Sequence, residues 1–160
     1  MASSRARSHH HAKLHLRHPE RSTFRGSQLT GYAVRDATGE DTLGEISDFV
    51  IEFGQQGLGE AGQSPFGAPA PVAARAKYAI VGFGGFLGIG EQYALVPFEA
   101  MSVDPDPSVR TFYLPTTREA FESSPRFSHD ILPGELSPGW DDEFAGFWHT
   151  ELGWEETARW

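Results

Sequence analysis

The stretch that decides the fold is Gly84-Gly85-Phe86-Leu87-Gly88-Ile89-Gly90-Glu91-Gln92-Tyr93-Ala94-Leu95-Val96-Pro97-Phe98-Glu99. Four glycines within its first seven residues predict a tight loop, because glycine adopts positive φ angles without a steric penalty. The apolar residues that follow predict a strand over Gln92–Phe98. A dinucleotide fingerprint is excluded by the spacing, since Leu87 stands where a third glycine is needed, and no Gly-Lys-Ser/Thr follows for a phosphate-binding loop. We therefore predict a structural loop, with Phe86, Leu87 and Ile89 folding onto an apolar surface.

Further strands are expected on both sides of this stretch. They are Leu29–Arg35, Leu43–Phe53, Lys77–Phe83 and Thr111–Leu114. Within the second of them the apolar alternation breaks at Ile46, which predicts a β-bulge near Ser47-Asp48. The strands Lys77–Phe83 and Gln92–Phe98 are apolar on both faces, so both faces must be covered by barrel curvature, by tail residues or by another subunit. A homodimer is therefore one hypothesis.

Residues 84–99 resemble the central signature of PRC-barrel domains, a family of small β-barrels. The resemblance continues through Leu29–Val34, Gly39-Glu40 and Leu43–Ile51 upstream, and through Thr116–Glu119 and Ser124–Phe127 downstream. It implies an all-β fold, a small PRC-type β-barrel of about five to six strands with a short helix after the last strand. Thr116 or Thr117 can cap that helix, and Ser124-Pro125 would end it. The signature positions that we expect to be structural are Gly84, Gly85, Phe86, Leu87, Gly88, Ile89, Gly90, Val96 and Pro97.

Three parts are expected along the chain: a basic arm over residues 1–26, the PRC-barrel domain over 27–127 and an aromatic, acidic extension over 128–160. The length of 160 residues supports one core. The chain has no cysteine, which excludes disulfides, thiolate metal sites and cysteine nucleophiles. No apolar run approaches the roughly 20 residues that span a bilayer, and no apolar segment follows the basic N-terminus. We therefore expect a cytoplasmic protein.

The first 25 residues carry six Arg or Lys and one acid, whereas the whole chain has a net charge of −9. A basic arm of this kind can bind RNA through residues 5–25, or bind an anionic membrane surface. A disordered tail is the favoured interpretation, because no aromatic residues are interleaved for base stacking. On a helix, His11, His15 and His18 would share one face at a metal-binding spacing. Pro19 closes this segment, so we expect no functional metal site there.

The link over residues 54–76 is rich in glycine, alanine and proline. Its composition predicts a mobile loop insertion in the barrel domain. The strands on either side can still pair, because the entropic cost of closing a loop grows only logarithmically with its length.

The C-terminal extension contains all four tryptophans. Asp141-Asp142-Glu143 predict a helix start, and Phe144, Trp148 and Leu152 follow at a helical spacing. This segment is either a lid that packs back on the barrel or a docking element for a partner. The candidate partner-binding residues are Phe144, Phe147, Trp148, Leu152, Trp154 and Trp160.

No catalytic, cofactor-binding or metal-binding set is predicted. Outside the arm only His129 and His149 remain, and no motif joins either to a nucleophile. The resemblance implies a non-catalytic assembly module, as in the cytoplasmic domain of the photosynthetic reaction centre H subunit and the C-terminal domain of the ribosome-maturation factor RimM. The chain looks most like free-standing bacterial members of the family. We predict a non-enzymatic protein-binding adaptor; the alternative is an RNA- or ribosome-associated maturation factor that uses the basic arm.

Overall fold

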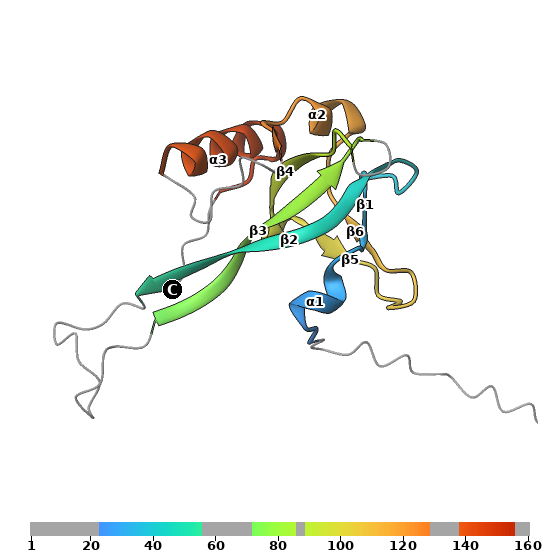
Figure 1. Ribbon diagram of the computed structural model, residues 1–160, viewed down its shortest axis with the longest axis horizontal. Helices are drawn as coiled ribbons and strands as arrows, with labels where there is room; N and C mark the ends of the chain where they lie inside the picture. Colours follow the sequence, from blue (N-terminus) through green and yellow to red (C-terminus); the bar gives the residue numbers. More distant parts are fainter. Residues whose placement is uncertain (1–22, 56–71, 86–88, 129–137, 156–160) are drawn as a thin grey trace, which may run out of the picture.

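The computed structural model describes residues 23–55, 72–85, 89–128 and 138–155. The predictions for the histidine-rich arm, for most of the glycine-rich link, and for Phe86, Leu87, Gly88 and Trp160 fall outside these residues. The elements, shown in Figure 1, are α1 (Gly26–Leu29), β1 (Ala33–Arg35), β2 (Thr42–Gln55), β3 (Val72–Phe83), β4 (Gln92–Pro97), the 3-10 helix η1 (Phe98–Ala100), β5 (Ser102–Val103), β6 (Thr111–Tyr113), α2 (Arg118–Glu122), β7 (Phe127–Ser128) and α3 (Pro138–Leu152).

The fold is mostly β, and its strands form one seven-stranded sheet in the order β5-β6-β1-β2-β3-β4-β7. Neighbouring strands are antiparallel except β1 and β6, which are parallel. The end strands β5 and β7 do not pair with each other in the described residues, so the sheet is not closed there. The sheet has more strands than the five to six expected, because the sequence analysis omitted β5 and β7, which have only two residues each.

The first predicted strand was wrong over its N-terminal half. Leu29 ends the short helix α1, and only Ala33–Arg35 are paired as a strand. The reason is local: Gly31 has a φ of 82°, which interrupts an extended chain. Leu29 and Tyr32 are still buried on the two sides of this turn. They therefore contribute to the core without belonging to the sheet.

The second strand contains the predicted β-bulge. The pairing of β2 with β3 shifts register between Ile46 and Asp48, so Ser47 has no direct partner. A second shift lies between Val50 and Ile51, where β3 carries the extra residue, Lys77. The two bulges restore the phase that places each apolar side chain on its own face of the sheet.

Strands β2 and β3 run further than the sequence predicted. Residues 54 and 55 pair with residues 73 and 72, so the strands enter the link from both ends. The neighbouring strands stop earlier, because β1 pairs with β2 only as far as Glu45 and β4 pairs with β3 only from Tyr78. We call residues 47–55 and 72–77 the β2–β3 arm. Figure 1 shows it as a long twisted ribbon that extends away from the other strands.

Both apolar faces of β3 and β4 are covered, each in a different way. On one face, Ala79, Val81, Ala94 and Val96 belong to a core cluster that also includes residues of β1, β6 and α2, together with Trp148 of α3. On the other face, a second cluster consists of Tyr78, Ile80, Tyr93, Leu95, Phe127 and Phe144. Phe144 comes from α3, which lies over β4 (Figure 1). Tail residues therefore cover the second face, which was one of the three arrangements expected.

Helix α3 is attached by polar contacts at both ends. Near its start, Asp141 accepts hydrogen bonds from the Lys77 ammonium group at 2.9 Å and from the Tyr78 hydroxyl at 2.7 Å. Near its end, the Trp148 indole N–H donates to the carbonyl oxygen of Leu95 at 2.7 Å. Strand β7 pairs only with the first residues of β4, and the Trp148 indole satisfies a backbone group of β4 beyond that point. The extension is therefore part of the same core as the sheet.

Two local predictions near the signature loop are confirmed. Gly84, Gly85 and Gly90 have φ angles of 68°, 77° and 76°, as expected for a tight loop. The expectation that Ile89 of this loop folds onto an apolar surface was wrong, because its side chain is 80% exposed. Helix α2 begins after Thr117, whose side-chain oxygen accepts a hydrogen bond from the backbone N–H of Ala120 at 3.1 Å.

Candidate functional site

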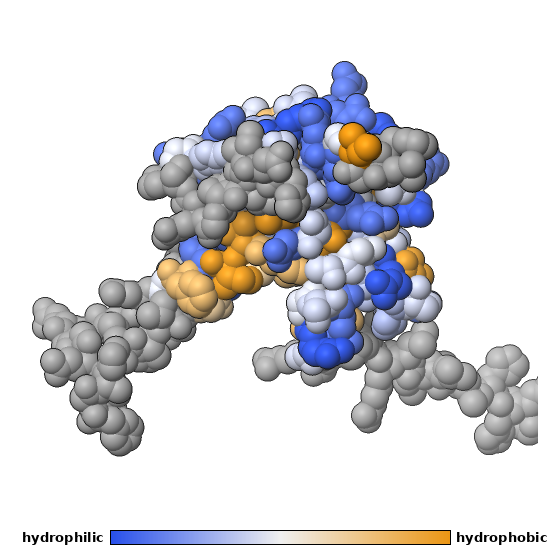
Figure 2. All heavy atoms as spheres, viewed as in Figure 1, coloured by the Kyte–Doolittle hydropathy of each residue, from blue (hydrophilic) through white to orange (hydrophobic). Residues whose placement is uncertain are grey.

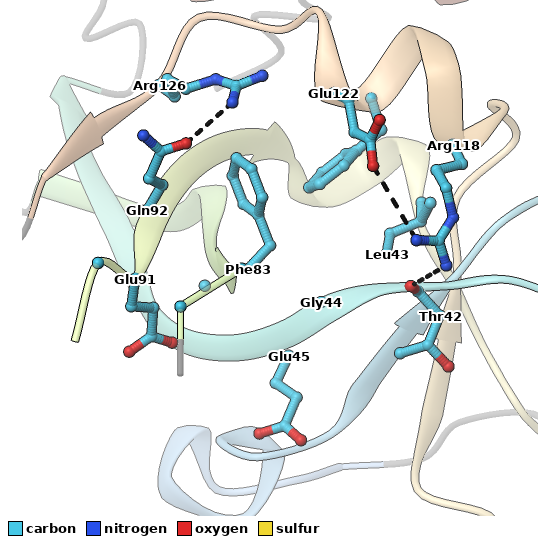
Figure 3. Close-up of a pocket in the computed structure, with 15 residues that line it drawn as sticks. Thr42, Leu43, Gly44, Glu45, Phe83, Glu91, Gln92, Arg118, Glu122 and Arg126 are labelled. Atoms are coloured by element: carbon cyan, nitrogen blue, oxygen red, sulfur yellow. Dashed lines mark hydrogen bonds and ion pairs between the residues drawn. The ribbon is translucent and has the colours of Figure 1, made fainter. Parts of the chain in front are cut away.

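A shallow pocket of about 1030 Å³ lies beside the signature loop. Figure 3 shows that its walls come from the start of β2, the end of β3, the start of β4 and the segment around α2. The strands cross closely here, since a Cβ atom on Gly44 would lie 2.4 Å from the carbonyl oxygen of Gly82. Gly44 is therefore required for the close approach of the two backbones.

The charged side chains of this pocket are of both signs, and both of its arginines are engaged with neighbouring groups (Figure 3). The Arg118 guanidinium donates to the carbonyl oxygen of Thr42 at 3.1 Å and lies 4.0 Å from the Glu122 carboxylate. The Arg126 guanidinium donates to Gln92 Oε1 at 2.9 Å. Exposed pairs of this kind contribute little energy, so the pocket has no concentrated charge that would select an ionic ligand.

Other titratable groups are held within turns. Burial acts to raise the pKa of Asp36, but hydrogen bonds from the Thr38 hydroxyl and from three backbone N–H groups outweigh it and hold the pKa below its ordinary value. Hydrogen bonds from the hydroxyl and the backbone N–H of Ser108 lower the pKa of Asp106. In the described part of the chain, no three His, Cys, Asp or Glu residues are grouped so that they could hold a metal ion. Among the same residues, no helix is long and apolar enough to cross a membrane.

The residues proposed for partner binding in the C-terminal extension are fully or partly buried where the structure describes them. Phe144 and Trp148 are 2% and 0% exposed against the sheet. Phe147, Leu152 and Trp154 are partly buried around the same core. These five residues pack on the sheet, as expected for a lid. The most apolar side of α3 is therefore already covered by strands of the same chain.

The β2–β3 arm carries an apolar surface that the sequence analysis did not identify as a site. Ile51 and Phe53 are 47% and 70% exposed. Alternation along a strand places them on the same face as Phe49, which is half-buried and packs edge-on against Phe98 with 5.4 Å between ring centroids. The exposed face is therefore continuous with the core cluster. In Figure 2 an apolar area extends over this part of the molecule.

The opposite face of the arm is charged and paired. The Glu52 carboxylate contacts the Lys77 ammonium group at 2.6 Å and the Arg75 guanidinium at 3.3 Å. The Lys77 side chain, which is only 9% exposed, also reaches Asp141 of α3. These ion pairs hold one face of the arm against α3, while Ile51 and Phe53 remain on the other face.

The outer edge of β2 along the arm has no neighbouring strand in the described residues. The backbone N–H of Phe49 donates a hydrogen bond of 2.8 Å to the carboxylate of the adjacent Asp48. Because backbone groups alternate in direction along a strand, the N–H groups of Ile51 and Phe53 face the same edge. An edge of this kind is a template for pairing with another extended chain.

Phe49, Ile51 and Phe53 alternate with polar or smaller residues in the sequence, which is the pattern of one strand face. What the pattern did not show is that β1 and β4 stop before they reach the arm.

No protein-family model matches the chain, and no curated protein matches its sequence.

Proposed function

We propose that this protein is a non-enzymatic, cytoplasmic protein-binding module, built on a PRC-barrel-type sheet, and that its binding surface is the β2–β3 arm. The observation that carries this proposal is the exposure of Ile51 and Phe53 beside an unpaired strand edge. The resemblance of residues 84–99 to the PRC-barrel signature supports it, because barrels of that family serve as assembly modules.

Covering this surface supplies part of the free energy that recognition needs. Complete burial of one large apolar side chain contributes about 1.5–3 kcal/mol. Because Ile51 is about half exposed and Phe53 is mostly exposed, covering both gains roughly 2–3 kcal/mol. A strand that adds to the edge also forms main-chain hydrogen bonds, and these set its direction and register.

The test is co-purification from the source cells, with the full-length chain as bait, both with and without ribonuclease. The arm variant carries Ile51→Thr and Phe53→Ser. A matched control carries Val109→Thr and Ile89→Ser, because these side chains are 46% and 80% exposed but lie outside the arm. We expect a stoichiometric protein partner that survives ribonuclease, is retained by the control and is lost from the arm variant.

Two results would contradict the proposal. A protein partner that the arm variant retains at the wild-type level would place the binding surface elsewhere. Partners that disappear with ribonuclease, and that require residues 5–25, would favour the RNA-associated alternative.

A further inference from the structure

We propose that the occupant of this surface is a second copy of the chain, bound by antiparallel pairing of the two β2 edges with Ile51 on the two-fold axis. The inference rests on the proposed function, because it names the partner of the same arm. A two-fold contact is isologous, so one segment must be complementary to itself when it runs in the opposite direction. Residues 48–54 meet that requirement in one register.

The backbone of the arm presents the groups that such pairing needs. The bond from the Phe49 N–H to Asp48 shows which edge the Phe49 backbone faces. By the two-residue alternation, Ile51 and Phe53 expose their N–H and C=O groups along the same edge. Ile51 is then able to exchange both backbone hydrogen bonds with Ile51 of the second copy.

The side chains of the apolar face match in this register. Ile51 lies opposite its own copy, and Phe49 lies opposite Phe53 on both sides of the axis. Each of these residues thus lies opposite an aliphatic or aromatic side chain, and apolar cross-strand pairs of this kind stabilise a sheet. Phe49 is already anchored against Phe98, so the joint face would continue the core of each copy.

Charge repulsion disfavours the two adjacent registers. An axis through Val50 would place Asp48 directly opposite Glu52 at both ends of the pairing. An axis through Glu52 would place that carboxylate opposite itself. Like charges directly opposite across two strands are destabilising, and in the Ile51 register Asp48 faces Gly54 while Glu52 faces Val50. The Glu52 carboxylate keeps its ion pairs with Arg75 and Lys77 of its own arm.

The next registers are disfavoured by loss of apolar matching. An axis through Phe49 would place Ile51 opposite Ser47, and an axis through Phe53 would place Ile51 opposite Gln55. Either arrangement leaves an aliphatic side chain against a polar one. The pattern of the strand therefore selects the pairing about Ile51.

The first measurement is the molar mass of the purified full-length protein by light scattering over a concentration series. We expect a concentration-dependent dimer. The Ile51→Asp substitution should weaken dimerisation by roughly tenfold or more, because it removes the central apolar pair and places two acids across the axis. Val109→Asp, at a similarly exposed position outside the arm, should leave the dimer unchanged.

Because the chain contains no cysteine, introduced cysteines report the register directly. Ile51→Cys should form an intermolecular disulfide on mild oxidation, since residues directly opposite have Cα atoms about 5.5 Å apart. Phe53→Cys alone should not, because its copy would lie about 14 Å away along the strands. A mixture of Asp48→Cys and Gly54→Cys chains should form the mixed disulfide, and Ile89→Cys controls for random collision.

A strict monomer at high micromolar concentration would overturn the inference. So would a Phe53→Cys disulfide as efficient as that of Ile51→Cys, since it would show a different register. If the chain is monomeric and the arm variant still loses a different protein in the co-purification, the inference fails and the proposed function stands. If the chain is monomeric and the arm variant loses nothing, both fail.

Discussion

Replacement of Trp148 by phenylalanine tests how strongly the C-terminal helix is built into the fold. Trp148 and Leu95 are both 0% exposed, and the indole N–H donates to the Leu95 carbonyl at 2.7 Å. Without the indole, that buried carbonyl loses its partner, which costs about 1–3 kcal/mol. The smaller ring also leaves a void that costs about 1 kcal/mol. We therefore expect Trp148→Phe to lower the free energy of unfolding by about 2–4 kcal/mol.

The matched control is Trp154→Phe, which removes the same donor from a hydrogen bond of the same length. The Trp154 indole N–H donates to the carboxylate of Glu99 at 2.7 Å, but this pair is exposed. Water can replace the lost donor, so we expect a cost of about 0.5–1 kcal/mol.

The assay is urea unfolding followed by far-ultraviolet circular dichroism, because tryptophan fluorescence changes with each substitution. Equal slopes of the transitions would show that the two variants differ in stability alone. If Trp148→Phe lowers the free energy of unfolding no more than Trp154→Phe does, then the bond from the Trp148 indole to the buried Leu95 carbonyl does not stabilise the fold. Our account of how α3 is attached would then be wrong.

Three further predictions concern the sheet and its turns. Gly44→Ala should unfold the protein or destabilise it by several kcal/mol, because the new Cβ would clash with the Gly82 carbonyl oxygen. Gly146→Ala, at a position on α3 with open space around it, should instead stabilise the protein by about 0.5–1 kcal/mol. The melting temperatures of the two variants should therefore shift in opposite directions. Thr117→Ala should cost about 1 kcal/mol in denaturant unfolding, since it removes the N-cap of α2, and an unchanged midpoint would refute this role. Burial acts to raise the pKa of Asp36, but the hydrogen bonds to its carboxylate hold that pKa below the ordinary value of 3.8. The carboxylate therefore contributes to stability above pH 3.8, and this contribution is lost as the pH falls through the lowered pKa. Asp36→Asn should flatten the acid side of the curve of unfolding free energy against pH, and a curve of unchanged shape would refute this role of Asp36.

The placement of the aromatic tail changes where a partner can bind. An exposed stripe of Phe144 and Trp148 would be a strong docking motif, but both side chains are buried in the core clusters that contain β3 and β4. Among the described residues, the exposed large apolar side chains on the sheet are Ile51 and Phe53 of the arm and, to a lesser extent, Val103 of the end strand β5. The proposed surface therefore follows from what α3 covers and from what it leaves open.

The sequence by itself determined the features that depend on a few neighbouring residues. The break in alternation at Ile46 predicted the bulge, the glycines after Phe83 predicted the loop with positive φ, and Thr117 was one of two predicted caps of α2. Each is set by the period of a strand, by the backbone freedom of glycine or by a hydroxyl near a helix end. These determinants act over one to four residues and are legible without the rest of the fold.

Only the tertiary structure decided what covers each apolar face. Alternation showed that β2, β3 and β4 had apolar faces, but coverage depends on where other strands end and where a distant helix lies. Strand β1 stops beside Glu45 and β4 stops beside Tyr78, so the arm beyond them is open along its edges in the described residues. Helix α3 covers one face of β3 and β4 and leaves Ile51 and Phe53 exposed, because contacts between residues far apart in the chain are set by packing and not by local pattern.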